Sequence, residues 1–210
     1  MDKRIAKGFD ILFARFGKQH WWPGDSPWEI CTGAVLTQNT SWSNVEKAIA
    51  LIKSADALDP NVVVKLPVAD LERLIRPSGF FRIKAQRLKN MAAWWLDNVQ
   101  NSKLKPGCSV AEWRHRLLDV NGIGPETADS ILLYCFNQPI FVIDAYTRRI
   151  SARHFGTDPE ISYHELQQLF MENLSVSAEL FNEYHALLVQ NAKECCRKNI
   201  CNEDCPLREV

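Results

Sequence analysis

One aspartate follows an uninterrupted apolar run and stands directly before a segment that carries two arginines. Residues 141–143 are Phe-Val-Ile, Asp144 comes next, and Arg148 and Arg149 follow about one helical turn later. An aspartate at such a place is a common helix N-cap, because its side chain accepts a hydrogen bond from a backbone N–H. Capping occupies one carboxylate oxygen and leaves the other available. Asp144 can therefore cap a helix and also stabilise positive charge that develops on a reacting group.

The segment that ends twenty residues before Asp144 predicts a tight hairpin between two helices. Gly122 and Gly124 flank Ile123, and Pro125 follows where a helix would begin. Glycine permits left-handed backbone and close approach of another chain, while proline suits the first helical turn. The N–H groups and the dipole of the second helix then attract a phosphate. An ordinary turn between helices is the alternative, so the hairpin alone indicates contact with a nucleic-acid backbone and says nothing of catalysis.

Four of the seven cysteines crowd the last sixteen residues: Cys195, Cys196, Cys201 and Cys205. The N-terminal segment has early charges but lacks the apolar stretch of a secretion signal, so we expect no export. In a chain that is not secreted, clustered cysteines favour metal binding or redox chemistry over structural disulfides.

The elements that position these residues are helical nearly throughout. Ser26 is predicted to cap a helix that begins at Pro27. The strand-like run at 140–143 is too short and isolated to build a sheet. We therefore predict an all-α protein. Further helices are expected over residues 83–99, 110–120, 125–137, 163–173 and 177–193.

Charge is balanced overall but uneven along the chain. Twenty-five basic and 25 acidic residues cancel, so net charge gives no support for nucleic-acid binding. Locally, basic residues could form one side that binds a polyanion, although solvated helix faces are the simpler interpretation. One basic group comprises Arg76, Arg82, Lys84, Arg87, Lys89, Lys103 and Lys105, and a second comprises Arg148, Arg149 and Arg153.

No run approaches the roughly 20 apolar residues that a membrane span needs. We therefore expect no membrane association. A monomeric state and a cytoplasmic location, at the nucleoid if the source is prokaryotic, are further expectations.

Together with four further segments, the hairpin and Asp144 resemble the helix-hairpin-helix DNA glycosylases of the endonuclease III branch. Within that branch the chain is most similar to the 3-methyladenine DNA glycosylase III subgroup, and the resemblance covers nearly the whole chain. The four segments are GAVLTQNT at 33–40, RPSGFF at 76–81, KAQRL at 84–88 and CPL at 205–207.

The resemblance implies a fold of two helical lobes with the active-site cleft between them. A six-helix lobe would span 27–138 and end in the helix-hairpin-helix motif, whose hairpin is 120–125. The second lobe would combine 1–26 with 139–210 and carry the cysteine-rich loop.

The resemblance also assigns roles by position. Asp144 matches the catalytic aspartate of the superfamily. Gln38 matches the residue that fills the gap left by a flipped nucleotide, and Phe80 matches an apolar wedge in the opposite strand. Aromatic residues next to the LTQNT segment match a base pocket, although tryptophans beside proline are more often part of a core. These aromatic residues are Trp21, Trp22 and Trp42.

At the hairpin, the resemblance implies contacts with the DNA backbone and a Na⁺ or K⁺ ion when DNA is bound. The carbonyls of Val120 and Ile123 would hold the ion. The backbone-contacting residues would be Gly122, Gly124, Glu126 and Thr127.

Glu126 departs from the bifunctional members, which place a lysine one residue after the position of Pro125. A glutamate cannot form the Schiff base that β-elimination requires. The sequence therefore predicts hydrolysis by water, with no abasic-site lyase activity and no cofactor needed for the chemistry.

The cysteines fit the family's [4Fe–4S] spacing, C-x6-C-x2-C-x5-C, only in part. Cys195 and Cys205 are spaced as the first and third ligands, Asn202 occupies the second position, and the fourth would be residue 211, after Val210. Members of the 3-methyladenine subgroup can lack the cluster. Two interpretations stay open, loss of the cluster or a bound cluster or metal with a structural role. The ligands would be Cys195 or Cys196, with Cys201 and Cys205.

Three functions compete. The first is a glycosylase that excises alkylated, 3-methyladenine-like bases from double-stranded DNA during base excision repair. The second is a glycosylase for oxidised or mispaired bases, which would favour polar groups over Trp42 in the pocket. The third is a DNA-binding helix-hairpin-helix protein without catalysis, which would not require Asp144 or Gln38. The first is favoured.

Overall fold

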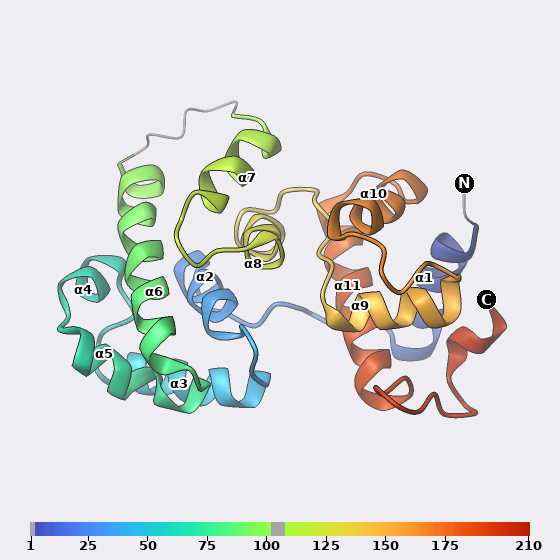
Figure 1. The fold of residues 1–210 in the computed structure, drawn as a ribbon, viewed down its shortest axis with the longest axis horizontal. Helices are drawn as coiled ribbons and strands as arrows, with labels where there is room; N and C mark the ends of the chain where they lie inside the picture. Colours follow the sequence, from blue (N-terminus) through green and yellow to red (C-terminus); the bar gives the residue numbers. More distant parts are fainter. Residues whose placement is uncertain (1–2, 102–107) are drawn as a thin grey trace. The chain divides into compact units, whose positions relative to one another are not determined.

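The protein folds into helices joined by short connections, as a computed structural model that describes residues 3–101 and 108–210 shows (Figure 1). Within these residues there is no β-strand, which confirms the predicted all-α class. Lys103 and Lys105 of the first basic group lie outside the described residues. The chain divides into two compact units. The first unit is Pro23–Phe136, and the second unit combines Met1–Trp22 with Asn137–Val210.

The first unit is built around α2, which is mostly apolar and is buried along most of its length. Ser26 caps this helix as predicted, since its side chain accepts a hydrogen bond from the Glu29 N–H. The indole of Trp28 packs against that of Trp95 with ring centroids 5.3 Å apart. The helices of this unit in the described residues are α2 (Pro27–Leu36), α3 (Trp42–Ser54), α4 (Pro60–Lys65), α5 (Val68–Ile75), α6 (Phe81–Trp95), α7 (Val110–Leu118) and α8 (Pro125–Ser130).

The second unit has an aromatic core around Tyr184. The Tyr184 side chain is fully buried and donates a hydrogen bond of 2.7 Å to the Ile5 carbonyl. The helix of Ile5 comes so close that a Cβ at Gly8 would lie 2.7 Å from the Tyr184 hydroxyl. These contacts join the N-terminal helix to the C-terminal half of the chain. The helices of this unit are α1 (Lys3–Phe16), α9 (Ala145–Ile150), α10 (Tyr163–Asn173) and α11 (Ala178–Glu194).

Three of the helices continue without a break into a wider π-helical turn. The turn η2 (Leu96–Gln100) extends α6, η3 (Ile131–Cys135) extends α8, and η4 (Ser151–Phe155) extends α9. The helices predicted over 83–99 and 125–137 therefore exist as composite segments. The third composite segment begins directly after Asp144 and contains His154 in its last turn.

The apolar run before Asp144 is an extended connection and not a strand. Its residues are buried in the second unit, with Phe141 fully buried and stacked on Phe170 at 4.4 Å. The side chain of Gln167 donates a hydrogen bond of 2.7 Å to the Phe141 carbonyl. This run therefore fixes the chain immediately before Asp144.

Candidate functional site

Asp144 is the N-cap of α9, as the sequence predicts. Its backbone is extended, and its Oδ1 atom accepts a hydrogen bond of 2.7 Å from the Thr147 N–H. The cap holds one carboxylate oxygen in a defined orientation. Because Oδ2 takes no part in the cap, the second oxygen can act on another group.

The Oδ2 atom of Asp144 faces His185 of α11, with Nε2 at 3.7 Å. The imidazole is 5% exposed. Burial lowers the pKa of His185 below its ordinary value, and the nearby Asp144 charge opposes that shift only partly. Burial disfavours the imidazolium form, so a neutral ring lies beside the carboxylate at neutral pH. Sequence reasoning missed His185, because a single histidine in an apolar helix carries no signal of contact 41 residues away.

The predicted hairpin connects α7 to α8 in the first unit. Gly122 has φ +92°, and a Cβ there would clash with the Arg87 side chain. Gly124 is exposed and has open space where a Cβ would be. Within the turn, the Ile123 N–H donates to the Val120 carbonyl at 3.0 Å. The monovalent cation at Val120 and Ile123 stays a prediction, and one of its two carbonyls already accepts this hydrogen bond.

Gln38 lies directly against the hairpin. Its Nε2 atom donates to the Gly122 carbonyl at 3.1 Å and to the Thr127 hydroxyl at 3.0 Å. Its Oε1 atom accepts a hydrogen bond of 2.5 Å from Arg87. The structure therefore brings the LTQNT segment, the hairpin and α6 together. Thr127 is buried, and its hydroxyl accepts the hydrogen bond from Gln38. Glu126 on the same helix is exposed.

Phe80 is 66% exposed at the start of α6, with φ +45°. The loop before it is anchored by Lys84, whose ammonium donates to the carbonyls of Ser78 at 2.6 Å and Leu36 at 2.9 Å. Burial and then the nearby Arg87 lower the pKa of Lys84 to about 8. The role of Phe80 as a wedge in the opposite DNA strand stays a prediction.

Trp42 lines a pocket of about 280 Å³ in the first unit. Lys53 lines this pocket and forms 2.7 Å ion pairs with Asp25 and Glu29. Acidic side chains outnumber basic ones on its wall. The wall consists of Pro23, Gly24, Asp25, Glu29, Trp42, Glu46, Ile49, Ala50 and Lys53.

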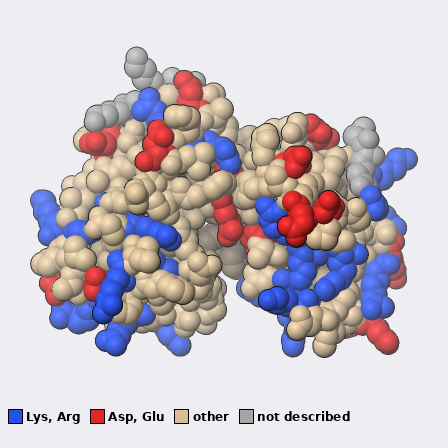
Figure 2. Space-filling view, in the orientation of Figure 1, with Lys and Arg blue, Asp and Glu red and all other residues tan. Residues whose placement is uncertain are grey.

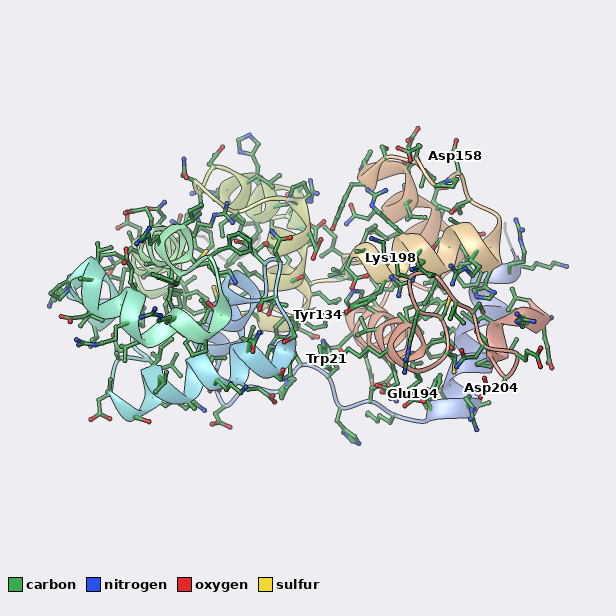
Figure 3. The ribbon with its side chains drawn as sticks, turned by 60° about the horizontal axis from the view of Figure 1, so that its bottom comes forward. Trp21, Tyr134, Asp158, Glu194, Lys198 and Asp204 are labelled. Carbon is green, nitrogen blue, oxygen red and sulfur yellow. The ribbon has the colours of Figure 1, made fainter. Side chains whose placement is uncertain are left out.

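Trp21, labelled in Figure 3, and Trp22 belong to the second unit. Their rings meet edge to face with centroids 5.6 Å apart. The Lys193 ammonium lies 5.5 Å from the Trp21 ring centroid. Both indoles are half-buried. Their assignment to a base pocket stays a prediction.

The second basic group points at the protein's own backbone. Lys and Arg side chains gather over α9 and the C-terminal segment (Figure 2). Arg148 donates to the Ile161 carbonyl at 2.6 Å, Arg149 to the Cys196 carbonyl at 3.0 Å, and Arg153 to the carbonyls of residues 197 and 198 at 3.0 and 3.2 Å. These arginines hydrogen-bond to the protein's own backbone, and both interpretations of the charge pattern stay predictions.

The C-terminal cysteines converge on a histidine that the sequence analysis did not identify. The Nε2 atom of His154 lies 3.5 Å from the sulfurs of Cys196 and Cys201 and 3.8 Å from that of Cys205. The ligand atoms of His154, Cys201 and Cys205 all lie within 4.8 Å of one another. His154 precedes the first of these cysteines by 42 residues, so spacing along the sequence gave no signal for it.

This arrangement does not fit the [4Fe–4S] cluster of the endonuclease III branch. Such a cluster needs four thiolates, and its irons and sulfides hold the ligand sulfurs far apart. Here an imidazole stands among the sulfurs, and the group is compact. Among the described residues, this compact group includes neither Cys195, which the spacing placed as first ligand, nor Cys196, although the Cys196 sulfur lies 3.5 Å from Nε2 of His154.

Comparison with known proteins relates the whole chain to DNA repair enzymes. Residues 32–175 match the family described as HhH-GPD superfamily base excision DNA repair protein. The chain is 41% identical over 207 residues to a putative DNA repair glycosylase of Methanocaldococcus jannaschii, covering 98% of this chain and 94% of that protein. It is 27% identical to endonuclease III of Thermotoga maritima, covering 94% and 87%.

Solved structures share the fold. The H. pylori 3-methyladenine DNA glycosylase bound to 1,N6-ethenoadenine is 27% identical with a TM-score of 0.76, covering 92% of this chain and 97% of that one. A non-covalent endonuclease III–DNA complex has a TM-score of 0.83 at 20% identity, covering 100% and 94%. No helix in the described residues is long and apolar enough to cross a membrane.

Proposed function

Because the chain belongs to the HhH-GPD superfamily of base excision DNA repair proteins, we propose that it is a monofunctional DNA glycosylase that hydrolytically removes alkylated, 3-methyladenine-like bases from double-stranded DNA. The observation that carries the proposal is the arrangement of the two carboxylate oxygens of Asp144. One oxygen of its carboxylate is fixed by the Thr147 N–H, and the other is outside the cap.

Excision requires the target nucleotide to leave the base stack, which costs a few kcal/mol. We assign to Phe80 and Gln38 the task of occupying the vacated space and offsetting part of that cost. Cleavage of the glycosidic bond leaves positive charge on the sugar. The Asp144 carboxylate stabilises that charge and orients the attacking water, and fixed negative charge at such a place needs no reorganisation during the reaction.

The pocket at Trp42 supports the preference for alkylated bases. A purine alkylated at N3 or N7 is cationic and already a good leaving group, so no general acid is required. An indole face attracts a cation by about 0.5–2 kcal/mol, and the excess of carboxylates on this wall acts in the same direction. The similarity to the 3-methyladenine DNA glycosylase of H. pylori agrees with this assignment.

The absence of lyase activity is supported by Glu126. It is exposed in the first turn of α8. The resemblance to the endonuclease III branch makes this the position where bifunctional members carry the lysine. A carboxylate cannot attack the sugar to give a Schiff base. Water is therefore the nucleophile, and the product is an intact abasic site.

The test is release of bases from methylated genomic DNA, with the products resolved by chromatography. We expect free 3-methyladenine together with abasic sites that stay uncleaved until alkali is added. Borohydride trapping in the same reaction should give no covalent protein–DNA adduct. Release of oxidised bases alone would refute the alkyl-base specificity, and a trapped adduct would refute the monofunctional mechanism.

A further inference from the structure

The C-terminal segment folds back on itself so that its cysteines face one point. Cys196 and Cys201 are paired by an antiparallel bridge that closes a short loop. The Asn202 N–H donates to the Cys195 carbonyl at 2.9 Å, and the Cys205 N–H donates to the Asn202 carbonyl at 3.1 Å. In Figure 3, Lys198 and Asp204 mark this segment after Glu194 at the end of α11.

One ring nitrogen meets three sulfurs at this point. An imidazole nitrogen can take part in one hydrogen bond along its lone pair or N–H. Three sulfurs at 3.5, 3.5 and 3.8 Å from Nε2 of His154 therefore exceed what hydrogen bonding can satisfy. Cys196 is fully buried and Cys205 is 2% exposed, so water has little access to form hydrogen bonds with their sulfurs.

We propose that His154, Cys201 and Cys205, whose ligand atoms lie within 4.8 Å of one another, bind one zinc ion, and that Cys196, with its sulfur 3.5 Å from Nε2 of His154, is the fourth ligand of a closed tetrahedral site. Zinc sites with Zn–S of about 2.3 Å and Zn–N of about 2.0–2.1 Å place the nitrogen about 3.5 Å from each sulfur of the tetrahedron. The three distances at His154 match this value. A site of three thiolates and one imidazole is of the kind that holds structural zinc.

The surroundings of the four side chains complete the site. A second hydrogen bond joins the His154 ring to the backbone of Leu207. Since Nε2 faces the sulfurs, Nδ1–H is the donor, and such a bond fixes the tautomer that a metal-binding histidine needs. Asn191 lies 3.8 Å from the Cys205 sulfur, where its Nδ2–H group can donate.

The charges also balance. Binding releases the protons of three thiols to solvent, and three thiolates with Zn²⁺ and a neutral imidazole leave one negative charge. Arg153 donates a hydrogen bond of 3.2 Å to the Cys196 sulfur and offsets that charge. Arg208 lies on the other side and donates to the Cys201 carbonyl at 3.1 Å. These bonds hold both loop cysteines toward His154.

The role of the ion is structural. All four ligands are protein side chains, so no position remains for water or substrate. The ion connects η4 to the C-terminal segment across a separation of 42 to 51 residues. It does so in place of a four-cysteine iron–sulfur cluster, with Cys195 outside the ligand set.

Metal analysis of the purified protein tests the proposal directly. We expect about one zinc per chain, little iron and no visible iron–sulfur absorption. After zinc removal, Co²⁺ should give the thiolate charge-transfer and intense visible bands of a tetrahedral site. About four irons per chain, or a metal-free protein whose thermal unfolding ignores chelators, would overturn the proposal.

Two variants test whether His154 or Cys195 is a zinc ligand. His154→Ala should lose most of its zinc on dialysis against a chelator, while Cys195→Ala, which changes a buried neighbour of Cys196, should keep the wild-type content. Zinc loss from Cys195→Ala with retention in His154→Ala would reject the assignment. If His154→Ala does not fold, His154→Cys replaces imidazole by thiolate. It should keep zinc and strengthen the Co²⁺ charge-transfer band.

Discussion

The Nε2 atom of His185 lies 3.7 Å from Oδ2 of Asp144, and the two side chains are only 6% and 14% exposed. Since burial lowers the pKa of His185, the imidazole is neutral at neutral pH and does not cancel the negative charge of the carboxylate. The ring instead lies beside Oδ2 of Asp144, where both side chains are largely buried. His185 is therefore a positioning residue in the proposed mechanism.

The lowered pKa of His185 makes stability depend on pH. Between that lowered value and the ordinary value of 6.5, the unfolded chain binds more protons than the folded chain. Stability contributed by the neutral ring is thus lost as the pH falls through this window, and the loss is complete below the folded-state pKa. Thermal unfolding measured from about pH 8 to about pH 5 should show this loss.

His185→Gln should flatten that pH dependence of the unfolding temperature. His115→Gln serves as the control, because His115 is 80% exposed. It should leave the wild-type slope unchanged. Parallel curves for wild type and His185→Gln would show that another group causes the acid destabilisation.

Asp144→Asn should lower the rate of base excision by at least about 100-fold, the usual effect of removing a preorganised electrostatic group. Folding should survive, because asparagine caps helices about as well as aspartate. Affinity for lesion-containing DNA should change by no more than about twofold, since the carboxylate acts on the transition state. Single-turnover kinetics and a binding titration measure the two effects.

Asp59→Asn is the matched control for that variant. Asp59 caps α4 in the first unit and accepts a hydrogen bond of 2.7 Å from the Asn61 N–H. The same substitution there should leave excision at the wild-type rate. Substantial activity in a folded Asp144→Asn protein would rule out the proposed role of Asp144.

The two hairpin glycines should respond differently to alanine. Gly122→Ala imposes a strained positive φ and a clash with Arg87, so it should lower the free energy of unfolding by about 1–3 kcal/mol. Gly124→Ala meets open space at φ −93° and should change it by less than about 0.5 kcal/mol. Urea denaturation of both variants measures this. Equal effects would mean that Arg87 does not pack on Gly122 in solution.

Trp42→Ala should change substrate preference. The cation–π energy of about 0.5–2 kcal/mol corresponds to a rate loss on cationic 3-methyladenine that is about 2- to 30-fold larger than the loss on neutral hypoxanthine. Trp113→Ala is the control, because Trp113 packs on Phe136 at 4.6 Å and is not part of the Trp42 pocket wall. Equal losses of excision rate on the two lesions would mean that Trp42 contributes only to the packing of the core.

Local rules explain what the sequence could predict. The Gly122-Ile123-Gly124-Pro125 order specifies a turn and a helix start by backbone geometry alone, and the structure has both. Asp144 could be identified as an N-cap for the same reason. Each of these features depends on residues within one or two turns of the chain.

The features that the sequence did not predict depend on contacts between residues far apart along the chain. His185 reaches Asp144 across 41 positions, and His154 reaches the cysteines across 42 or more. Neither histidine stands in a local motif. The π-helical turns also escaped prediction, because the apolar spacing of a helix continues through them with only a small change of register.

Asp144 and His154 stand at opposite ends of one composite helix, α9 with η4. Each residue added to or removed from a helix rotates one end by about 100° relative to the other. An insertion or deletion between these two residues would therefore turn either the carboxylate away from His185 or the imidazole away from the cysteines. Substitutions at exposed positions of this segment can be tolerated during evolution, but its length is fixed by the two side chains that it separates.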